Sequence, residues 1–308
     1  DELSEVLSID KVLSSLLIQR GIHTFDQAKK FFRPSLDDLH DPFLLKDMDI
    51  AVSRIEKAIA NNENILIYGD YDVDGTTAVS LVSSYLKTIT NHIATYIPDR
   101  YDEGYGISTQ GIDFAADHDF SLIIALDCGI KAIEKVNYAS KKNIDFIICD
   151  HHKPGDKLPK AVAVLNAKRE DCSYPFDELC GCGVGFKLIQ ALASKRGQTL
   201  EDLTQYLDLV ATAIAADIVP ITGENRILTY FGLQVINSNP RNGIKAIIQG
   251  VKKNILTITD VVFIIAPRIN AAGRMKHGNY AVELLTEMDY ETAISFAASI
   301  EKFNIERK

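Results

Sequence analysis

Short apolar runs that each end at an aspartate recur three times along this sequence. The aspartates are Asp70, Asp127 and Asp150, after runs over residues 65–69, 121–126 and 144–149. Segments with helical periodicity separate these runs, and two further strands are expected over 93–97 and 161–165. This alternation predicts an α/β fold, a mostly parallel sheet flanked by helices. Ligands of such sheets bind beyond the carboxyl ends of the strands, so we expect the three aspartates to share a functional rim.

An acidic segment follows the first of these runs. Asp70, Asp72 and Asp74 occupy every second position, and Gly75 lets the backbone turn before a helix expected over 77–90. Carboxylates packed this closely repel one another, and keeping them ionised needs a counter-charge. A divalent cation is the counter-charge that we expect.

Two other interpretations of the acidic segment are weaker. The spacing Asp70-x-Asp72-x-Asp74-Gly75 matches the first half of a calcium loop of the EF-hand type, but Leu81 stands at the twelfth position, where a bidentate glutamate belongs. The element before the loop is also predicted to be a strand rather than a helix. A solvated acidic turn explains two aspartates better than three that adjoin a buried strand.

Imidazole groups and one more carboxylate join the predicted rim. His151 and His152 come directly after Asp150, and because adjacent side chains diverge we expect one to bind metal and the other to face the substrate. Asp217 ends a strongly apolar helix expected over 206–216, where an unpaired carboxylate would be costly to bury. The metal cluster is its expected partner, and a helix cap or a salt bridge is the alternative.

The loop over residues 99–106 is a candidate for substrate binding. Arg100 is suited to a phosphate, and Tyr101 or Tyr105 to stacking on a base. Its composition is typical of a binding loop, although an ordinary polar turn is an equal alternative.

A second candidate segment covers residues 266–275. Arg268, Asn270 and Arg274 frame small residues here and break the helical pattern. Small residues permit close approach and arginine forks suit phosphate oxygens, so we predict an anion site.

Glycines alternate with other residues in segment 179–187, ahead of a helix expected over 186–195. Amides at a helix start can hold a phosphate. Lys187 is not followed by Ser or Thr, however, as a Walker loop requires. We therefore expect these glycines to serve close helix packing.

The composition of the chain limits its possible partners and location. Its 308 residues are 46% hydrophobic and carry a formal net charge of -9, which argues against non-specific coating of nucleic acid. A nuclease stays compatible with this charge, because carboxylates of a metal site add to the acidic count. No apolar run approaches the length of a membrane span and no signal peptide is visible, so we expect a cytoplasmic protein without a membrane partner.

Taken in order, these motifs resemble the DHH phosphoesterase superfamily, which is named for the sequence found here as Asp150-His151-His152. The resemblance is strongest to the RecJ-like single-strand-specific DNA exonucleases. It is carried by segments 69–77, 127–129, 150–152, 215–220 and 267–274, with the loop over 98–108 in addition.

The resemblance implies a catalytic centre built on Asp127 and the Asp150-His151-His152 motif, with two divalent cations, Mn²⁺ or Mg²⁺. The implied metal ligands are Asp72, Asp74, Asp127, His151 and Asp217. Asp127 would bridge the cations, and His152 would contact the scissile phosphate. Many superfamily members carry a histidine where this chain has Tyr68, and Asp70 is expected to compensate as a ligand. Arg268, Asn270 and Arg274 would hold DNA phosphates.

The resemblance also implies a domain organisation. Residues 1–50 would form a helical N-terminal arm and residues 51–290 the DHH catalytic domain. Residues 291–308 would begin a helix that links to a C-terminal domain absent from this sequence.

The implied activity is metal-dependent hydrolysis of single-stranded DNA from its 5′ end, in DNA repair and recombination. A single-strand-binding protein or a helicase is the implied protein partner. One alternative keeps the chemistry but acts on short oligonucleotides, cyclic dinucleotides or pyrophosphate. A second alternative is a non-catalytic module that binds single strands, and it predicts the loss of acidic residues that this chain retains.

Overall fold

The computed structural model describes the backbone of residues 2–275 and 279–306, and the side chains of residues 2–272 and 279–302. It divides the chain into two compact units, residues 1–39 and residues 40–308. Residues 40–50, which the sequence grouped with an N-terminal arm, lie in the second unit. They contain a short 3-10 helix (η2, Pro42–Leu44) and the start of α4 (Met48–Ala60).

The first unit consists of short helices packed on a small apolar centre. Its elements are α1 (Glu2–Leu7), α2 (Lys11–Gln19), α3 (Phe25–Phe32) and a 3-10 turn (η1, Leu36–Asp38). Leu3, Leu17, Ile22 and Ala28 form the buried centre. Helix α3 begins at a reciprocal capping box formed by Thr24 and Gln27.

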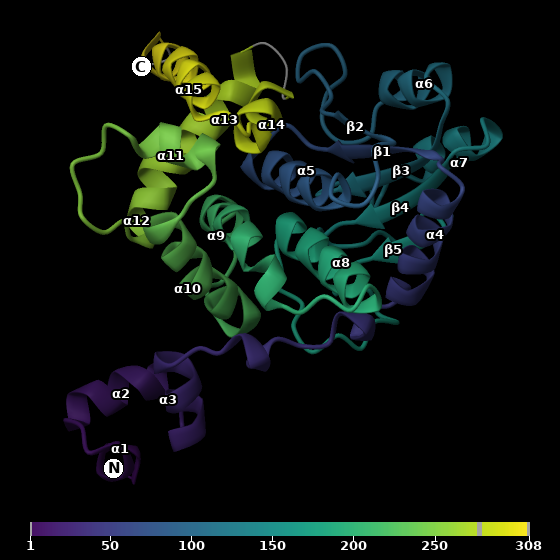
Figure 1. Ribbon diagram of the computed structural model, residues 1–308. Coiled ribbons are helices and arrows are strands. Elements are labelled where there is room, and N and C mark those ends of the chain that lie inside the picture. The colour runs from purple at the N-terminus through teal and green to yellow at the C-terminus, as the bar shows by residue number, and fades with distance from the viewer. Residues whose placement is uncertain (1, 276–278, 307–308) are drawn as a thin grey trace. The chain divides into compact units, whose positions relative to one another are not determined.

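A parallel five-stranded sheet organises the second unit and confirms the predicted fold class (Figure 1). Its strands, in the spatial order β2-β1-β3-β4-β5, are β1 (Asn64–Gly69), β2 (Ile93–Tyr96), β3 (Phe120–Leu126), β4 (Asp145–Cys149) and β5 (Ala163–Leu165). Gly69 pairs with Leu126, and Leu126 pairs with Cys149. The residues that come next are Asp70, Asp127 and Asp150, so the register places all three at the same edge of the sheet.

Helices cover both faces of this sheet. Helices α4, α5 (Val73–Leu86) and α8 (Gly181–Lys195) pack on one face, and α6 (Thr109–Asp117) and α7 (Ile133–Lys141) on the other (Figure 1). Leu66 and Tyr68 of β1, for example, pack with Ile112 of α6 and Val136 of α7. Strands covered on both faces read as continuous apolar runs, which is why they were visible in the sequence.

Helices continue the chain after the sheet and pack beside α5 and α8 (Figure 1). They are η3 (Glu201–Tyr206), α9 (Leu207–Ala216), α10 (Gly223–Ser238), α11 (Asn242–Ile248), α12 (Ile258–Asp260), a π-helix (η4, Val261–Ile265), α13 (Ala266–Met275), α14 (Asn279–Thr286) and α15 (Tyr290–Glu306). Within the described parts of the chain, no helix combines the length and the apolar character that crossing a membrane requires.

One expectation about this helical region is wrong. The helical pattern expected to break over 266–275 continues, because these residues form α13. Residues 279–306 form two helices, α14 and α15, with an interruption between them. Asp289 lies in the interruption, and its carboxylate accepts hydrogen bonds from the backbone and hydroxyl of Thr292 in the first turn of the new helix.

Candidate metal centre

The acidic segment after β1 is a helix start rather than a loop. Asp72 is the N-cap of α5 and accepts a hydrogen bond from the Gly75 amide at 2.9 Å, so Asp74 and Gly75 already lie in the first helical turn. A Cβ on residue 75 would lie 2.4 Å from the carbonyl oxygen of Asp70. Gly75 is therefore required for close approach of the helix to the strand end, and the predicted role in a turn is wrong.

Asp74 is held by the start of α8. Its Oδ2 accepts a hydrogen bond from the Gly181 amide at 2.6 Å, and its Oδ1 accepts one from the Cys182 amide at 2.7 Å. The glycine segment is thus the first turn of α8, five residues earlier than predicted, and its amides bind a carboxylate of the chain itself. The packing role predicted for the glycines is confirmed, because a Cβ on Gly181 would lie 2.5 Å from the Cβ of Asp127.

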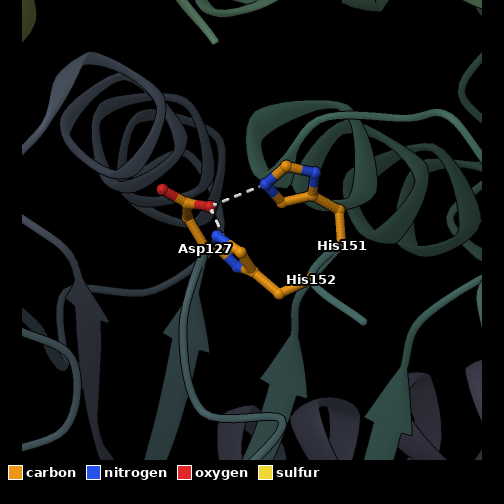
Figure 2. Close-up of side chains that lie close together, drawn as sticks. All are labelled: Asp127, His151 and His152. Carbon is orange, nitrogen blue, oxygen red and sulfur yellow. Dashed lines mark ion pairs between the residues drawn. The ribbon is translucent and has the colours of Figure 1, made fainter. Parts of the chain in front are cut away.

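Asp127 lies at the centre of the site. It follows β3 with a φ of 59°, and its amide donates a hydrogen bond to the Cys149 carbonyl at 2.9 Å. Its Oδ1 is buried without a hydrogen-bond partner. His151 Nε2 lies 3.2 Å and His152 Nδ1 4.0 Å from this oxygen, so both imidazoles turn toward it (Figure 2). The expectation that the two adjacent histidines diverge is therefore wrong.

Asp150 shapes the site through hydrogen bonds. It accepts from the amides of Ile130, His151 and His152, and its Oδ1 lies 2.7 Å from His152 Nδ1. Burial raises the pKa of Asp150, but the hydrogen bonds and the positive charge of His152 outweigh it, and the net pKa is lowered. Asp150 is thus an ionised acceptor that orients His152.

His151 faces carboxylates on three elements. Its Nε2 lies 3.2 Å from Asp127 Oδ1, 3.5 Å from Asp217 Oδ2 and 3.7 Å from Asp74 Oδ2. Neither ring nitrogen has a hydrogen-bond partner, and burial lowers the pKa of His151 to about 4. The ring is therefore neutral at pH 7, the form in which imidazole binds a metal.

The carboxylates around His151 resist ionisation in the absence of a cation. Burial, and then the charge of Asp72, raises the pKa of Asp70 to about 7. Burial, and then Asp217, raises the pKa of Asp74 to about 8, and burial with Asp72 raises that of Asp217 to about 6. Desolvation and like charge both oppose the ionised state, and a bound cation would offset both.

The donor set fits divalent cations. Three groups of residues each bring three ligand atoms within 4.8 Å of one another. The groups are Asp74 with His151 and Asp217, Asp70 with Asp72 and Asp127, and Asp127 with His151 and His152. The buried oxygens Asp70 Oδ2, Asp127 Oδ1 and Asp217 Oδ2 have no hydrogen-bond partner. Carboxylate oxygens with a neutral imidazole suit Mn²⁺, and Asp127 belongs to two groups, which suggests adjacent positions for two ions.

Tyr68 stands outside these groups. Its hydroxyl donates a hydrogen bond to the Gly106 carbonyl at 2.8 Å and accepts one from the Ser108 amide at 3.0 Å. Tyr68 therefore anchors the loop that follows β2, and Asp70 is the residue of this segment that joins the metal groups.

The loop after β2 brings part of the predicted substrate segment to the site. The hydroxyl of Tyr105 lies 3.4 Å from His152 Nε2. Arg100 lies over the ring of Tyr71, 5.1 Å from its centroid, while the side chain of Tyr101 is exposed.

In the second predicted substrate segment, Arg268 is bound to other residues of the protein. On α13, Arg268 Nε lies 2.6 Å from Glu301 Oε2 of α15, and Nη1 donates to the Ile264 carbonyl at 2.9 Å. Asn270 lies on the same helix. The side chain of Arg274 is outside the described residues.

Sequence reasoning missed one functional contact, the pair of α8 amides that hold Asp74. Alternating glycines before an apolar helix were the signal available for it.

Comparisons with known proteins agree with this geometry. Residues 64–214 match the DHH family, N-terminal domain. The single-stranded-DNA-specific exonuclease RecJ of Bacillus subtilis is 40% identical over an alignment of 308 residues, which covers 99% of this chain and 38% of that protein. RecJ of Escherichia coli is 31% identical over an alignment of 322 residues including gaps, which covers 100% of this chain and 55% of that protein. The chain thus spans about half or less of these relatives.

Solved RecJ structures share the fold. A crystal structure of exonuclease RecJ bound to manganese superposes with a TM-score of 0.80 at 29% identity, covering 89% of this chain and 68% of that one. RecJ from Thermus thermophilus in complex with Mn²⁺ gives a TM-score of 0.84 at 26% identity, covering 99% of this chain and 43% of that one. The chain belongs to the DHH family, whose N-terminal domain it carries over residues 64–214, and the relatives described above are RecJ proteins.

Proposed function

We propose that this chain is the catalytic part of a metal-dependent exonuclease that removes nucleotides from the 5′ end of single-stranded DNA. One observation supports this proposal most strongly. Buried ligand atoms without a hydrogen-bond partner converge beyond the ends of β1, β3 and β4, namely Asp70 Oδ2, Asp127 Oδ1, Asp217 Oδ2 and His151 Nε2. The sheet order changes direction at β1 and β3, where ligands of such sheets bind. The single-stranded DNA substrate follows the names of the RecJ relatives, and the 5′ direction follows from the family resemblance of the sequence motifs.

The ligand groups suggest which residues hold each cation. Asp74, His151 and Asp217 would hold one ion and Asp70 and Asp72 the other, with Asp127 between them. Bound Mn²⁺ or Mg²⁺ supplies stabilisation of the charge that develops on the attacking and leaving oxygens. The α8 amides fix Asp74, and Asp150 orients the more exposed His152 toward the scissile phosphate.

The substrate would contact residues outside the metal groups. Arg100, which lies over the ring of Tyr71, would bind a phosphate. Arg268, Asn270 and Arg274 would contact phosphates further along the strand, with Arg268 first leaving Glu301. The cytoplasm is the proposed location, and a single-strand-binding protein or a helicase would be the partner that supplies single strands.

The domain organisation is part of the same proposal. Residues 51–290 would form the catalytic domain, preceded in sequence by an arm of which residues 1–39 are a separate compact unit. Helix α15 would begin the link to a further domain, in keeping with the greater length of the relatives.

Cleavage of a 5′-labelled single-stranded oligonucleotide with Mn²⁺, beside the same sequence as blunt duplex and a dinucleotide, tests this function. We expect release of labelled mononucleotide from the single strand alone, and none from the Asp127→Asn variant. Cleavage of the dinucleotide without cleavage of the long strand would instead identify a phosphodiesterase of short oligonucleotides. Single-strand binding without any cleavage would identify a non-catalytic relative.

A further inference from the structure

Two glycines set the direction of the Tyr105 side chain. Gly104 and Gly106 have φ values of 83° and 79°, and no atom lies within 4 Å of a Cβ built on either. Both positions therefore have room for a side chain, and it is the left-handed backbone conformation that favours glycine there. The consequence of this backbone is that the tyrosine between them points back to the rim of the sheet.

Hydrogen bonds on both sides of Tyr105 hold this backbone. On its C-terminal side, the buried Tyr68 hydroxyl binds the Gly106 carbonyl and the Ser108 amide. On its N-terminal side, Glu103 accepts hydrogen bonds from the Asp99 amide at 2.8 Å and the Tyr96 hydroxyl at 2.9 Å. The position of Tyr105 is thus fixed before any substrate binds.

The hydroxyl of Tyr105 lies beside the metal groups, and the residue as a whole is 58% exposed. The hydroxyl is 3.4 Å from His152 Nε2, and it is one of the groups that favour the ionised form of Asp70. Because ionised Asp150 accepts the hydrogen on His152 Nδ1, Nε2 is the ring nitrogen that meets Tyr105. The ring of Tyr105 packs edge-to-face with Tyr71 and with His152, and neither contact is a stack on a base.

We propose that Tyr105 is a catalytic residue whose hydroxyl donates a hydrogen bond to a non-bridging oxygen of the scissile phosphodiester, beside His152. The proposal rests on the proposed nuclease function and replaces the base-stacking role expected from the sequence. A phenol keeps its proton at neutral pH, so it is an uncharged donor that adds no further negative charge to the carboxylates. Such a preorganised donor stabilises the charge that the phosphate gains during the reaction. No proton leaves the tyrosine.

The Tyr105→Phe variant, with Tyr230→Phe on α10 as its matched control, tests this role. We measure kcat and KM on a single-stranded oligonucleotide at saturating Mn²⁺, and Mn²⁺ affinity by calorimetry. Tyr105→Phe should lower kcat roughly 100-fold, as the loss of one donor to a developing charge does. Its KM and Mn²⁺ affinity should stay near those of the unaltered protein. Tyr230→Phe removes the same atom from an exposed residue outside the candidate site and should leave kcat, KM and Mn²⁺ affinity unchanged.

Three outcomes would overturn the proposal. If Tyr105→Phe retains full kcat while Tyr105→Ala raises KM, the ring serves base stacking alone. If Tyr105→Phe loses Mn²⁺ affinity, the hydroxyl supports the metal site instead of the substrate. If the unaltered protein cleaves no single strand, the nuclease function itself fails, a result that no Tyr105 variant can imitate.

Discussion

The Gly181 amide donates a hydrogen bond of 2.6 Å to Asp74 Oδ2, and this contact joins the first turn of α8 to a candidate metal ligand on α5. The positive end of the α8 dipole favours the carboxylate. The same glycine lies against Asp127, because a Cβ here would be 2.5 Å from the Asp127 Cβ and 2.8 Å from its Cα. One residue therefore sets the spacing between two candidate ligands.

Gly181→Ala should weaken Mn²⁺ binding at least tenfold, because the added methyl must displace the backbone of Asp127 or the start of α8. Calorimetric titration with Mn²⁺ measures this change. Gly155→Ala is the matched control, since a Cβ there meets nothing closer than 3.9 Å. Equal Mn²⁺ affinity of both variants would show that the spacing of Asp74 and Asp127 does not depend on Gly181.

The sequence was sufficient to place the sheet and most of the site. Buried parallel strands are continuous apolar runs, and the position of an aspartate after each run needs only the register of the sheet. The starts of α5 and α8 were predicted late, because Gly75 and Gly181 resemble loop residues when only neighbours in sequence are considered. Both glycines are required by tertiary contacts, Gly75 by the approach of the Asp70 carbonyl and Gly181 by the approach of Asp127.

The pairing of Arg268 with Glu301 could not be predicted for a related reason. Both residues lie on amphipathic helices, and the contact depends on how α13 packs against α15. Periodicity identifies the buried face of each helix but not which residues meet across the interface. A predicted phosphate-binding arginine thus has an internal carboxylate partner.

Mn²⁺ should stabilise the protein more at pH 8 than at pH 6. The native pKa values of Asp70, Asp74 and Asp217, about 7, 8 and 6, exceed the value of about 4 in an unfolded chain. The native state therefore binds more protons, and these groups make the metal-free protein less stable as the pH rises from about 4 to 8. Mn²⁺ competes with these protons, so its affinity rises over the same range.

Thermal unfolding in EDTA and in excess Mn²⁺ at the two pH values measures this effect. The Mn²⁺-induced rise in Tm should be larger at pH 8, and Asp127→Asn should remove most of it at both. A rise in Tm that does not depend on pH would mean that the cation displaces no protons from these carboxylates.

Glu301→Gln should tighten binding of single-stranded DNA several-fold at low salt. The substitution removes the carboxylate 2.6 Å from Arg268 Nε and leaves the guanidinium available to a phosphate. Arg268→Ala should weaken binding and reduce the salt dependence by about one charge. Fluorescence anisotropy in Ca²⁺, at several salt concentrations, measures both variants. Glu283→Gln is the control, because it makes the same change of charge at an exposed position of α14. If Glu283→Gln tightens DNA binding equally, the gain comes from the net charge of the protein and not from the release of Arg268.

Ile218→Gly should raise the free energy of unfolding by about 1 kcal/mol, because a β-branched residue in the left-handed region is strained. Ile218 has a φ of 58° and is 90% exposed, so its side chain contributes little burial to offset this strain. Urea unfolding in EDTA measures the change. Asp119→Gly, at a φ of 57°, is the control and should gain less, because aspartate tolerates this conformation better.

The strained residue Ile218 directly follows Asp217, whose amide ends α9 by donating a hydrogen bond to the Ala213 carbonyl at 2.9 Å. If the left-handed Ile218 holds Asp217 toward His151, the more stable variant will bind Mn²⁺ less tightly, whereas a gain in stability with unchanged affinity would separate the strain from the metal centre.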